Sequence, residues 1–145
     1  MKQEMRLEID SIPSNEAFAR VVVAAFLTRL NPTMEEIADI KTAVSEAVTN
    51  AIIHGYQNEV HKIEIAAQVE KDFLTVSVKD FGVGIEDIEK AMEPMFTTRK
   101  DLERSGMGFV FMEAFMDSIQ VESEVGAGTT VIMKKKIGRR YEMQE

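Results

Sequence analysis

The chain has 145 residues, of which 25 are acidic and 17 are Lys or Arg, giving a formal net charge of −8. This length is typical of one compact domain, and 45% hydrophobic with 29% charged residues is an ordinary globular composition. The acidic balance argues against direct nucleic-acid binding, which depends on a dense basic footprint. The chain has no cysteine, which excludes disulfides and thiolate metal sites.

Neither a leader nor a membrane span is expected. The N-terminal residues Met1–Glu4 are not followed by the apolar run of a signal peptide, and no stretch approaches the roughly 20 apolar residues that cross a bilayer. We therefore expect one cytoplasmic domain over residues 1–145. The basic residues near the C-terminus, Lys134–Lys136 with Arg139 and Arg140, fit a solvated strand end and tail.

The first part of the chain predicts one strand and two helices. Apolar and charged residues alternate over residues 5–9, which indicates a short half-buried strand. An apolar helix is predicted over about residues 13–30. Thr33 and Glu36 form a capping-box pattern for a second helix, which we expect to run to about His54.

The rest of the chain predicts two hairpins with helices between them. Alternating segments at residues 63–69 and 74–78 indicate the first hairpin, and residues 119–132 indicate the second, around a glycine turn. Between them we expect a weak helix over about 85–92, a long polar loop over 93–105 and a helix over about 106–117. These elements predict an α+β fold: a two-layer α/β sandwich with a mixed, mostly antiparallel sheet and helices on one face.

The second helix carries the first candidate site residues. At about 100° per residue, Glu46 and Asn50 stack one turn apart, roughly opposite the apolar stripe that faces the core. The neighbouring Ala43 and Ala47 are small and apolar, so a pocket wall competes with an ordinary solvated face. A carboxylate in a pocket can accept a proton from a hydroxyl, and an Asn oxygen suits Mg²⁺.

A glycine-containing segment follows the first hairpin. Asp80 ends a predicted strand, and a carboxylate there can accept a hydrogen bond from an exocyclic amine such as that of adenine. Gly82 and Gly84 let the backbone turn and approach a ligand closely. A plain turn after a strand is the alternative interpretation.

A second glycine segment and a polar loop suit phosphate. Gly106, Met107 and Gly108 precede a predicted helix, whose N-terminal amides form an anion site. The polar loop before them fits a lid whose cations offset the charge of a transferring phosphoryl group, with a solvated charged loop as the alternative. Its candidate residues are Thr97, Thr98, Arg104 and Ser105. In the closing hairpin, Thr129 or Thr130 can touch a base through its hydroxyl.

The chain resembles the ATP-binding domain shared by gyrase, heat-shock-90 proteins, histidine kinases and MutL in the order of its motifs: E-x-x-x-N, D-x-G-x-G, lid, G-x-G and G-T-T. Closer still, it is similar to the sporulation anti-sigma F factors, serine kinases of endospore-forming bacteria. That similarity is carried by the segments SEAVTNAIIHGY, MFTT and ERSGMGF. The resemblance covers nearly the whole chain and implies the histidine-kinase-like ATPase fold.

The resemblance also implies a role for each motif. The ligands are ATP or ADP with Mg²⁺; Glu46 is the general base and Asn50 coordinates the metal. Asp80 recognises adenine, and Thr130 lies near the base. The other nucleotide-binding residues that it implies are Gly82, Gly84, Gly106, Met107 and Gly108. Phe81 stands where relatives carry a small or charged residue, and we expect its ring to bear on nucleotide affinity.

The implied partners are a sporulation sigma factor, held inactive, and an anti-anti-sigma protein that is phosphorylated on serine. A homodimer is implied too. Two alternatives stay open: a nucleotide-gated binding module without kinase activity, and a sibling kinase that controls a general-stress sigma factor. The polar side of the first helix, with Glu16 and Arg20, is a candidate partner surface, and an ordinary solvated face is the alternative.

Overall fold

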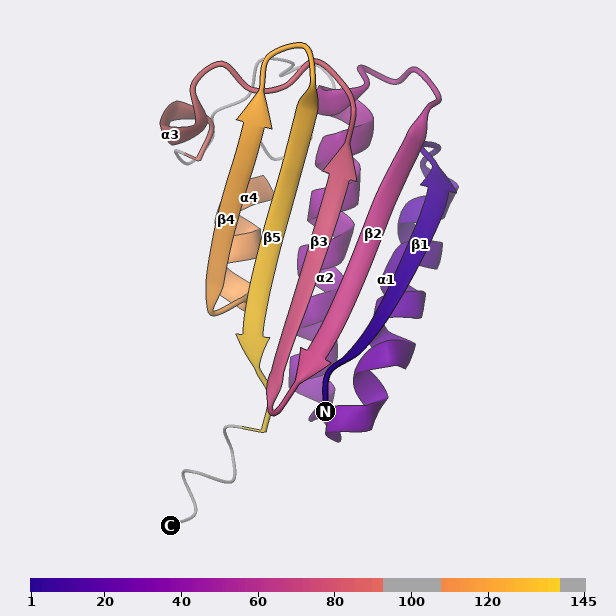
Figure 1. Cartoon of the computed structure of the whole chain (residues 1–145), viewed down its shortest axis with the longest axis vertical. Coiled ribbons are helices and arrows are strands. Elements are labelled where there is room, and N and C mark those ends of the chain that lie inside the picture. Colours follow the sequence, from indigo (N-terminus) through magenta and orange to yellow (C-terminus); the bar gives the residue numbers. More distant parts are fainter. Residues whose placement is uncertain (93–107, 139–145) are drawn as a thin grey trace.

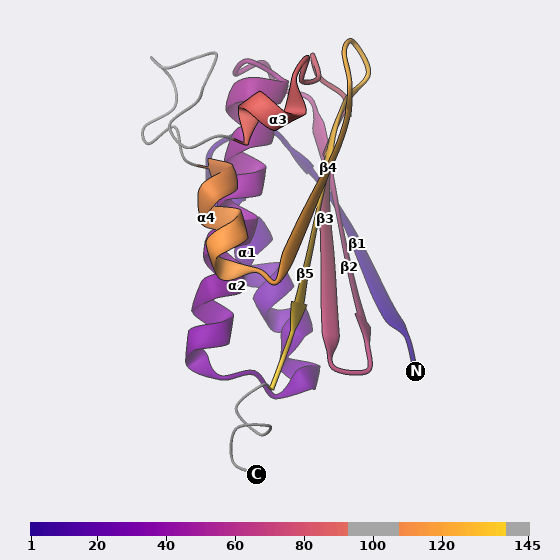
Figure 2. The same cartoon turned by 90° about the vertical axis from the view of Figure 1, so that its left-hand side faces the viewer.

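The computed structural model describes residues 1–92 and 108–138 and consists of two layers, a sheet and the helices that cover one of its faces (Figure 1, Figure 2). The five strands follow the order β1-β2-β3-β5-β4, and each neighbouring pair is antiparallel. The predicted α+β sandwich is therefore confirmed, with a fully antiparallel sheet in the described residues. The strands are β1 (Gln3–Asp10), β2 (Lys62–Glu70), β3 (Phe73–Asp80), β4 (Ser118–Glu124) and β5 (Gly128–Lys136).

The helices of the described residues are α1 (Ser14–Leu27), α2 (Met34–Asn50), α3 (Ile88–Ala91) and α4 (Gly108–Phe115). Helix α2 lies behind the middle of the sheet and packs against both α1 and α4 (Figure 1). It begins with the predicted capping box: the Thr33 hydroxyl accepts from the Glu36 amide at 3.0 Å, and the Glu36 carboxylate accepts from the Thr33 amide at 2.8 Å. Because α2 is covered on several sides, its residues are well placed to line a cavity as well as the core.

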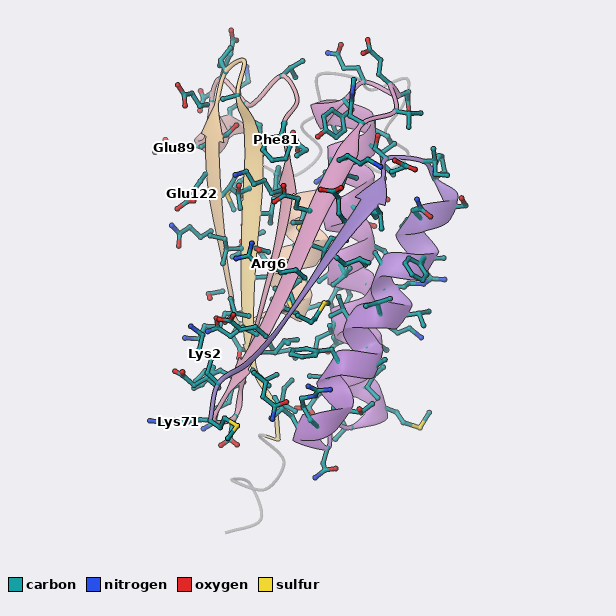
Figure 3. The ribbon with its side chains drawn as sticks, turned by 45° about the vertical axis from the view of Figure 1, so that its right-hand side comes forward. Lys2, Arg6, Lys71, Phe81, Glu89 and Glu122 are labelled. Carbon is teal, nitrogen blue, oxygen red and sulfur yellow. The ribbon has the colours of Figure 1, made fainter. Side chains whose placement is uncertain are left out.

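The core forms between one stripe of α2 and the inward face of the sheet. The predicted stripe is buried at Ile40, Val44, Val48 and Ile52. Alternate strand residues meet it, including Ile63, Ile65, Leu74, Val76, Val131 and Met133. Residues of the other parity face solvent, and Figure 3 shows Arg6 and Glu122 among the side chains of that outer face.

Several predicted ends shift by a few residues. The first helix finishes in a 3₁₀ turn over Thr28–Leu30, and the weak helix predicted from residue 85 begins only at Ile88, where Asp87 caps the amide of Lys90. Helix α4 ends at Phe115, whose carbonyl accepts from the Lys135 ammonium at 2.8 Å. The predicted polar loop over 93–105 lies outside the described residues. Within the described segments, no helix has the length and apolar character that crossing a membrane requires.

Candidate functional site

A cavity of about 740 Å³ lies at the end of the sheet where β3 stops and β5 starts. Its volume falls in the range of small-molecule and cofactor sites. One wall comes from α2, the floor from the sheet residues Val78 and Val131, and the far wall from the segment that leads into α3. The α2 wall is made by Ala47 and Asn50 and is continued by Ala51 and His54 just after the helix. The far wall is made by Val83, Gly84, Ile85, Glu86, Asp87, Lys90 and Ala91.

The candidate residues of α2 occupy different positions with respect to this cavity. Asn50 lines it, and Ala47 beside it is buried, in agreement with the expected pocket wall. Glu46 lies one turn before Asn50, is half-buried and is not among the lining residues.

Immediately after Asn50, α2 continues into a single π-helical turn over Ala51–Gly55. The turn is closed by the amide of Tyr56, which donates to the carbonyl of Ala51 at 2.9 Å. Single π turns inside helices occur frequently at functional sites. Here the turn adds His54 and Gly55 to the cavity wall.

Asp80 is the buried carboxylate of the cavity, with 5% of its surface exposed. Its Oδ1 accepts from the Gly82 amide at 2.9 Å. Burial raises the pKa of Asp80, while hydrogen bonds from the Gly82 and Thr129 amides lower it in part. A carboxylate has about four acceptor positions, so Asp80 can accept further hydrogen bonds from a ligand.

Two glycines bring the end of α2 against the loop after β3. A Cβ on Gly55 would lie 2.7 Å from the Asp80 carboxyl carbon, and a Cβ on Gly82 would lie 1.9 Å from the Gly55 carbonyl oxygen. The amide of Val83 also donates to that carbonyl at 3.0 Å. The two segments are therefore in backbone contact, and Gly82 serves that contact rather than the lining of the cavity. Gly84, with a φ of 79°, does line it.

The expectation for Thr130 needs a correction. Thr130 pairs with Lys79 and Glu122 and belongs to the outer face of the sheet. Thr129 is the residue that lines the cavity, with 8% of its surface exposed and its hydroxyl 2.8 Å from that of Ser123. The physical reason is the two-residue period of a strand, because Val131 faces inward and residue 129 shares its side.

Phe81 also points away from the cavity. Figure 3 shows it at the end of β3, where 49% of the surface of Phe81 is exposed and the Lys79 ammonium lies 4.9 Å from the ring centroid. The ring therefore does not touch the cavity walls. An effect of Phe81 on nucleotide affinity would therefore act through its backbone and not through its ring.

The remaining candidate residues are Gly108, two residues of α1 and the residues of the polar loop. Gly108 begins α4, as expected for the glycine segment, and the next residue, Phe109, lines the cavity. Glu16 and Arg20 form an i,i+4 ion pair on α1 at 3.6 Å. The candidates Thr97, Thr98, Arg104, Ser105, Gly106 and Met107 lie outside the described residues.

Several wall residues were not singled out from the sequence. They are Gly55, Gln57 and Val125. Thr129 had a usable signal in the strand parity of Val131. The contribution of Gly55 had no local signal, because it depends on a contact with residues that follow about 25 positions later.

The chain matches known proteins over most of its length. Residues 11–135 match the Histidine kinase-like ATPase domain family. An anti-sigma F factor of Clostridium acetobutylicum is 60% identical over 136 residues, which cover 94% of this chain and 95% of that protein. An anti-sigma F factor of Geobacillus kaustophilus is 56% identical over 140 residues, 96% of each chain. The catalytic domain of histidine kinase ThkA, at 19% identity, has a TM-score of 0.56 over 92% of this chain and 96% of that domain, which shows a shared fold.

Proposed function

Because the chain belongs to the histidine kinase-like ATPase domain family and, within it, to the anti-sigma F factors, we propose that it holds a sporulation sigma factor inactive and acts as an ATP-dependent serine kinase. Its proposed substrate is a small anti-anti-sigma protein, which displaces the sigma factor while it is unphosphorylated. We include in the proposal a homodimer and a cytoplasmic location. The observation that supports the ATP dependence is the cavity in which Asp80 and Asn50 share one lining.

The part of the cavity around Asp80, called the base end below, fits adenine. Asp80 offers a desolvated carboxylate to an exocyclic amine, and the apolar side chains of Val78 and Val131 offer surfaces for a flat ring. Gly55 keeps the space beside the Asp80 carboxyl group free of side-chain atoms. This combination favours a purine with an amino group over one with a carbonyl at the same position.

The part of the cavity around Asn50, called the phosphate end below, fits a magnesium ion that is shared with the ligand. Asn50 places a neutral amide in the lining, and residues 1–92 with 108–138 contain no group of three or more His, Cys, Asp or Glu that could hold a metal. Mg²⁺ is commonly bound through one or two protein oxygens together with substrate phosphates and water. Asn50 would be the protein ligand, and the ion would neutralise phosphate charge during transfer.

Glu46 and α4 have the remaining roles in the proposed transfer. Glu46, one turn before Asn50, would accept the proton of the partner serine as its oxygen attacks the γ-phosphorus. The N-terminal amides of α4 at Gly108 would donate to phosphate oxygens, where the helix dipole favours negative charge. We retain Arg104 as a charge-stabilising residue and Thr97, Thr98, Ser105, Gly106 and Met107 as nucleotide contacts; these are predictions from the sequence resemblance.

The test is phosphate transfer from γ-labelled ATP with Mg²⁺ to a purified anti-anti-sigma protein. Wild type should label the partner, and Glu46→Gln should bind ATP while transferring about 10²- to 10⁴-fold more slowly, the usual contribution of a general base. Asp80→Asn should lose ATP binding. Comparable transfer by Glu46→Gln would remove Glu46 as the base. No transfer by wild type that binds ATP would favour the gated binding module or a different partner.

A further inference from the structure

Tyr56 joins three segments of the chain at the base end of the cavity. It follows the π turn directly and is buried, with 6% of its surface exposed. Its hydroxyl donates to the carbonyl of Lys62 at the start of β2 and accepts from the amide of Phe81, just after β3, at 2.8 Å. The ring is held against His61, with ring centroids 4.9 Å apart. Both functions of the hydroxyl, donor and acceptor, are therefore used by backbone groups.

The Phe81 amide is a sensitive place for such a bond. It lies between Asp80, whose carboxylate faces the cavity, and Gly82, whose amide binds that carboxylate. The same loop is held from the other side by the bond between Val83 and Gly55. The hydroxyl of Tyr56 is thus a side-chain bond that fixes the loop next to Asp80 without touching the cavity itself.

The protonated hydroxyl is maintained by its surroundings. Burial raises the pKa of Tyr56 most strongly. The hydrogen bond from the Phe81 amide lowers it by less than burial raises it, and the negative charges of Asp80 and Glu64 raise it further. The phenol therefore keeps its proton at neutral pH and continues to donate to Lys62. A permanent donor and acceptor in one rigid aromatic side chain is well suited to holding two backbone segments at a fixed separation.

We propose that Tyr56 is a positioning residue that sets the orientation of the Asp80 carboxylate through the Phe81 backbone, and so determines the preference for a 6-amino purine. The proposal rests on the proposed nucleotide binding at Asp80. In ATP the amine donates to the carboxylate, whereas in ITP a carbonyl oxygen faces it and gains nothing from its exact orientation. Loosening the loop should consequently weaken ATP binding more than ITP binding.

The experiment compares the dissociation constants of ATP and ITP in wild type and Tyr56→Phe by calorimetry. Wild type should prefer ATP. Tyr56→Phe should lose about 3- to 10-fold in ATP affinity, the usual size of one hydrogen bond, with a smaller loss for ITP, so the preference falls. A preference equal to that of wild type would overturn the positioning role, because a merely structural defect would weaken both nucleotides alike.

Ser11→Ala is the matched control. The Ser11 hydroxyl is also buried and also bridges two backbone groups, the Glu59 carbonyl at 3.0 Å and the His61 amide at 2.8 Å. Ser11 follows β1 and holds the segment before β2, and no hydrogen bond of its hydroxyl reaches Asp80. Ser11→Ala should lower stability and leave the ratio of ATP to ITP affinity as in wild type; a fall in that ratio equal to that of Tyr56→Phe would overturn the specific role of Tyr56.

Asp80→Asn separates this inference from the proposed function. If Asp80→Asn keeps the wild-type preference, the base site itself is wrong and the positioning role falls with it. If Asp80→Asn abolishes the preference but Tyr56→Phe keeps it, the nucleotide site stands and only the positioning role is refuted. Should Tyr56→Phe fail to fold by circular dichroism, amide exchange at Phe81 in wild type decides: ATP should slow it more than ITP, and equal slowing would overturn the inference.

Discussion

Replacing Gly55 by alanine tests the geometry of the base end most directly. The added methyl carbon would lie 2.7 to 2.8 Å from three atoms of the Asp80 carboxyl group, closer than real Cβ atoms approach such neighbours. The carboxylate cannot turn away without cost, because its Oδ1 is bound by the Gly82 amide at 2.9 Å. Gly55 itself has no left-handed φ, so alanine meets no backbone strain there.

The expected magnitude follows from that displacement. Ordinary contact begins at 3.4 Å, so the carboxylate must move by about 0.7 Å from a 2.7 Å approach. A hydrogen bond to a charged group contributes about 1.5–3 kcal/mol, and losing one corresponds to about 10- to 150-fold in dissociation constant. Folding should change little, because alanine is favoured over glycine in helical segments by about 1 kcal/mol, which offsets the local crowding.

The assay is ATP binding by calorimetry together with urea unfolding of the same samples. Gly126→Ala is the control, because nothing lies within 4 Å of its added methyl although its φ is 84°. It should lose about 1 kcal/mol of stability from left-handed strain and keep its ATP affinity. If Gly55→Ala folds normally and its dissociation constant for ATP lies within about threefold of wild type, a difference of less than about 0.7 kcal/mol, then ATP affinity does not depend on the position of the Asp80 carboxylate.

Three further changes test other parts of the molecule. The pKa of Asp80 is raised in the folded state, so between the unfolded and the folded pKa the folded protein binds a proton that the unfolded chain has released. The stability of wild type relative to Asp80→Asn should therefore fall as pH rises through the interval between these two pKa values. Urea unfolding of both proteins at neutral and mildly acidic pH measures this, and an equal stability difference at the two pH values would contradict it. Glu36→Ala removes acceptors for two amides, including that of Gly138 at 2.9 Å, and should cost about 1–3 kcal/mol in urea unfolding without altering ATP affinity; an unchanged midpoint would show that these bonds contribute nothing. Arg20→Glu breaks the pair with Glu16 and should weaken capture of the sigma factor while ATP binding is retained; equal loss of both in pull-down and calorimetry would indicate misfolding instead.

Local patterns were sufficient for most of the fold. The capping box at Thr33 and Glu36 and the apolar stripe of α2 predict the start and the buried face of that helix, because both depend on residues within one or two turns. The alternation in β2 and β3 predicts their hairpin for the same reason. Element ends were less predictable: α4 stops at Phe115, where its carbonyl meets the ammonium of Lys135 from β5.

The site was predictable only in part. Asp80 and Asn50 have chemical types and positions that single them out, and both line the cavity. Thr130 was preferred over Thr129 through resemblance although strand parity pointed to Thr129. Gly55 could not be recognised from its neighbours, because what matters is the approach of the Gly82 backbone across the fold.

The π turn of Ala51–Gly55 also sets the angle around the helix axis between the residues before the turn and those at its end. Asn50, just before the turn, lines the cavity, and Gly55, the last residue of the turn, lies against the Asp80 carboxyl group. A regular α-helix advances by about 100° per residue, so deleting one residue of the turn would rotate Gly55 by about that angle relative to Asn50. The chain would still be helical, yet Asn50 and Gly55 would no longer face the same cavity. Under the proposed function, the extra residue in this turn is thus what lets one helical segment serve both ends of a nucleotide.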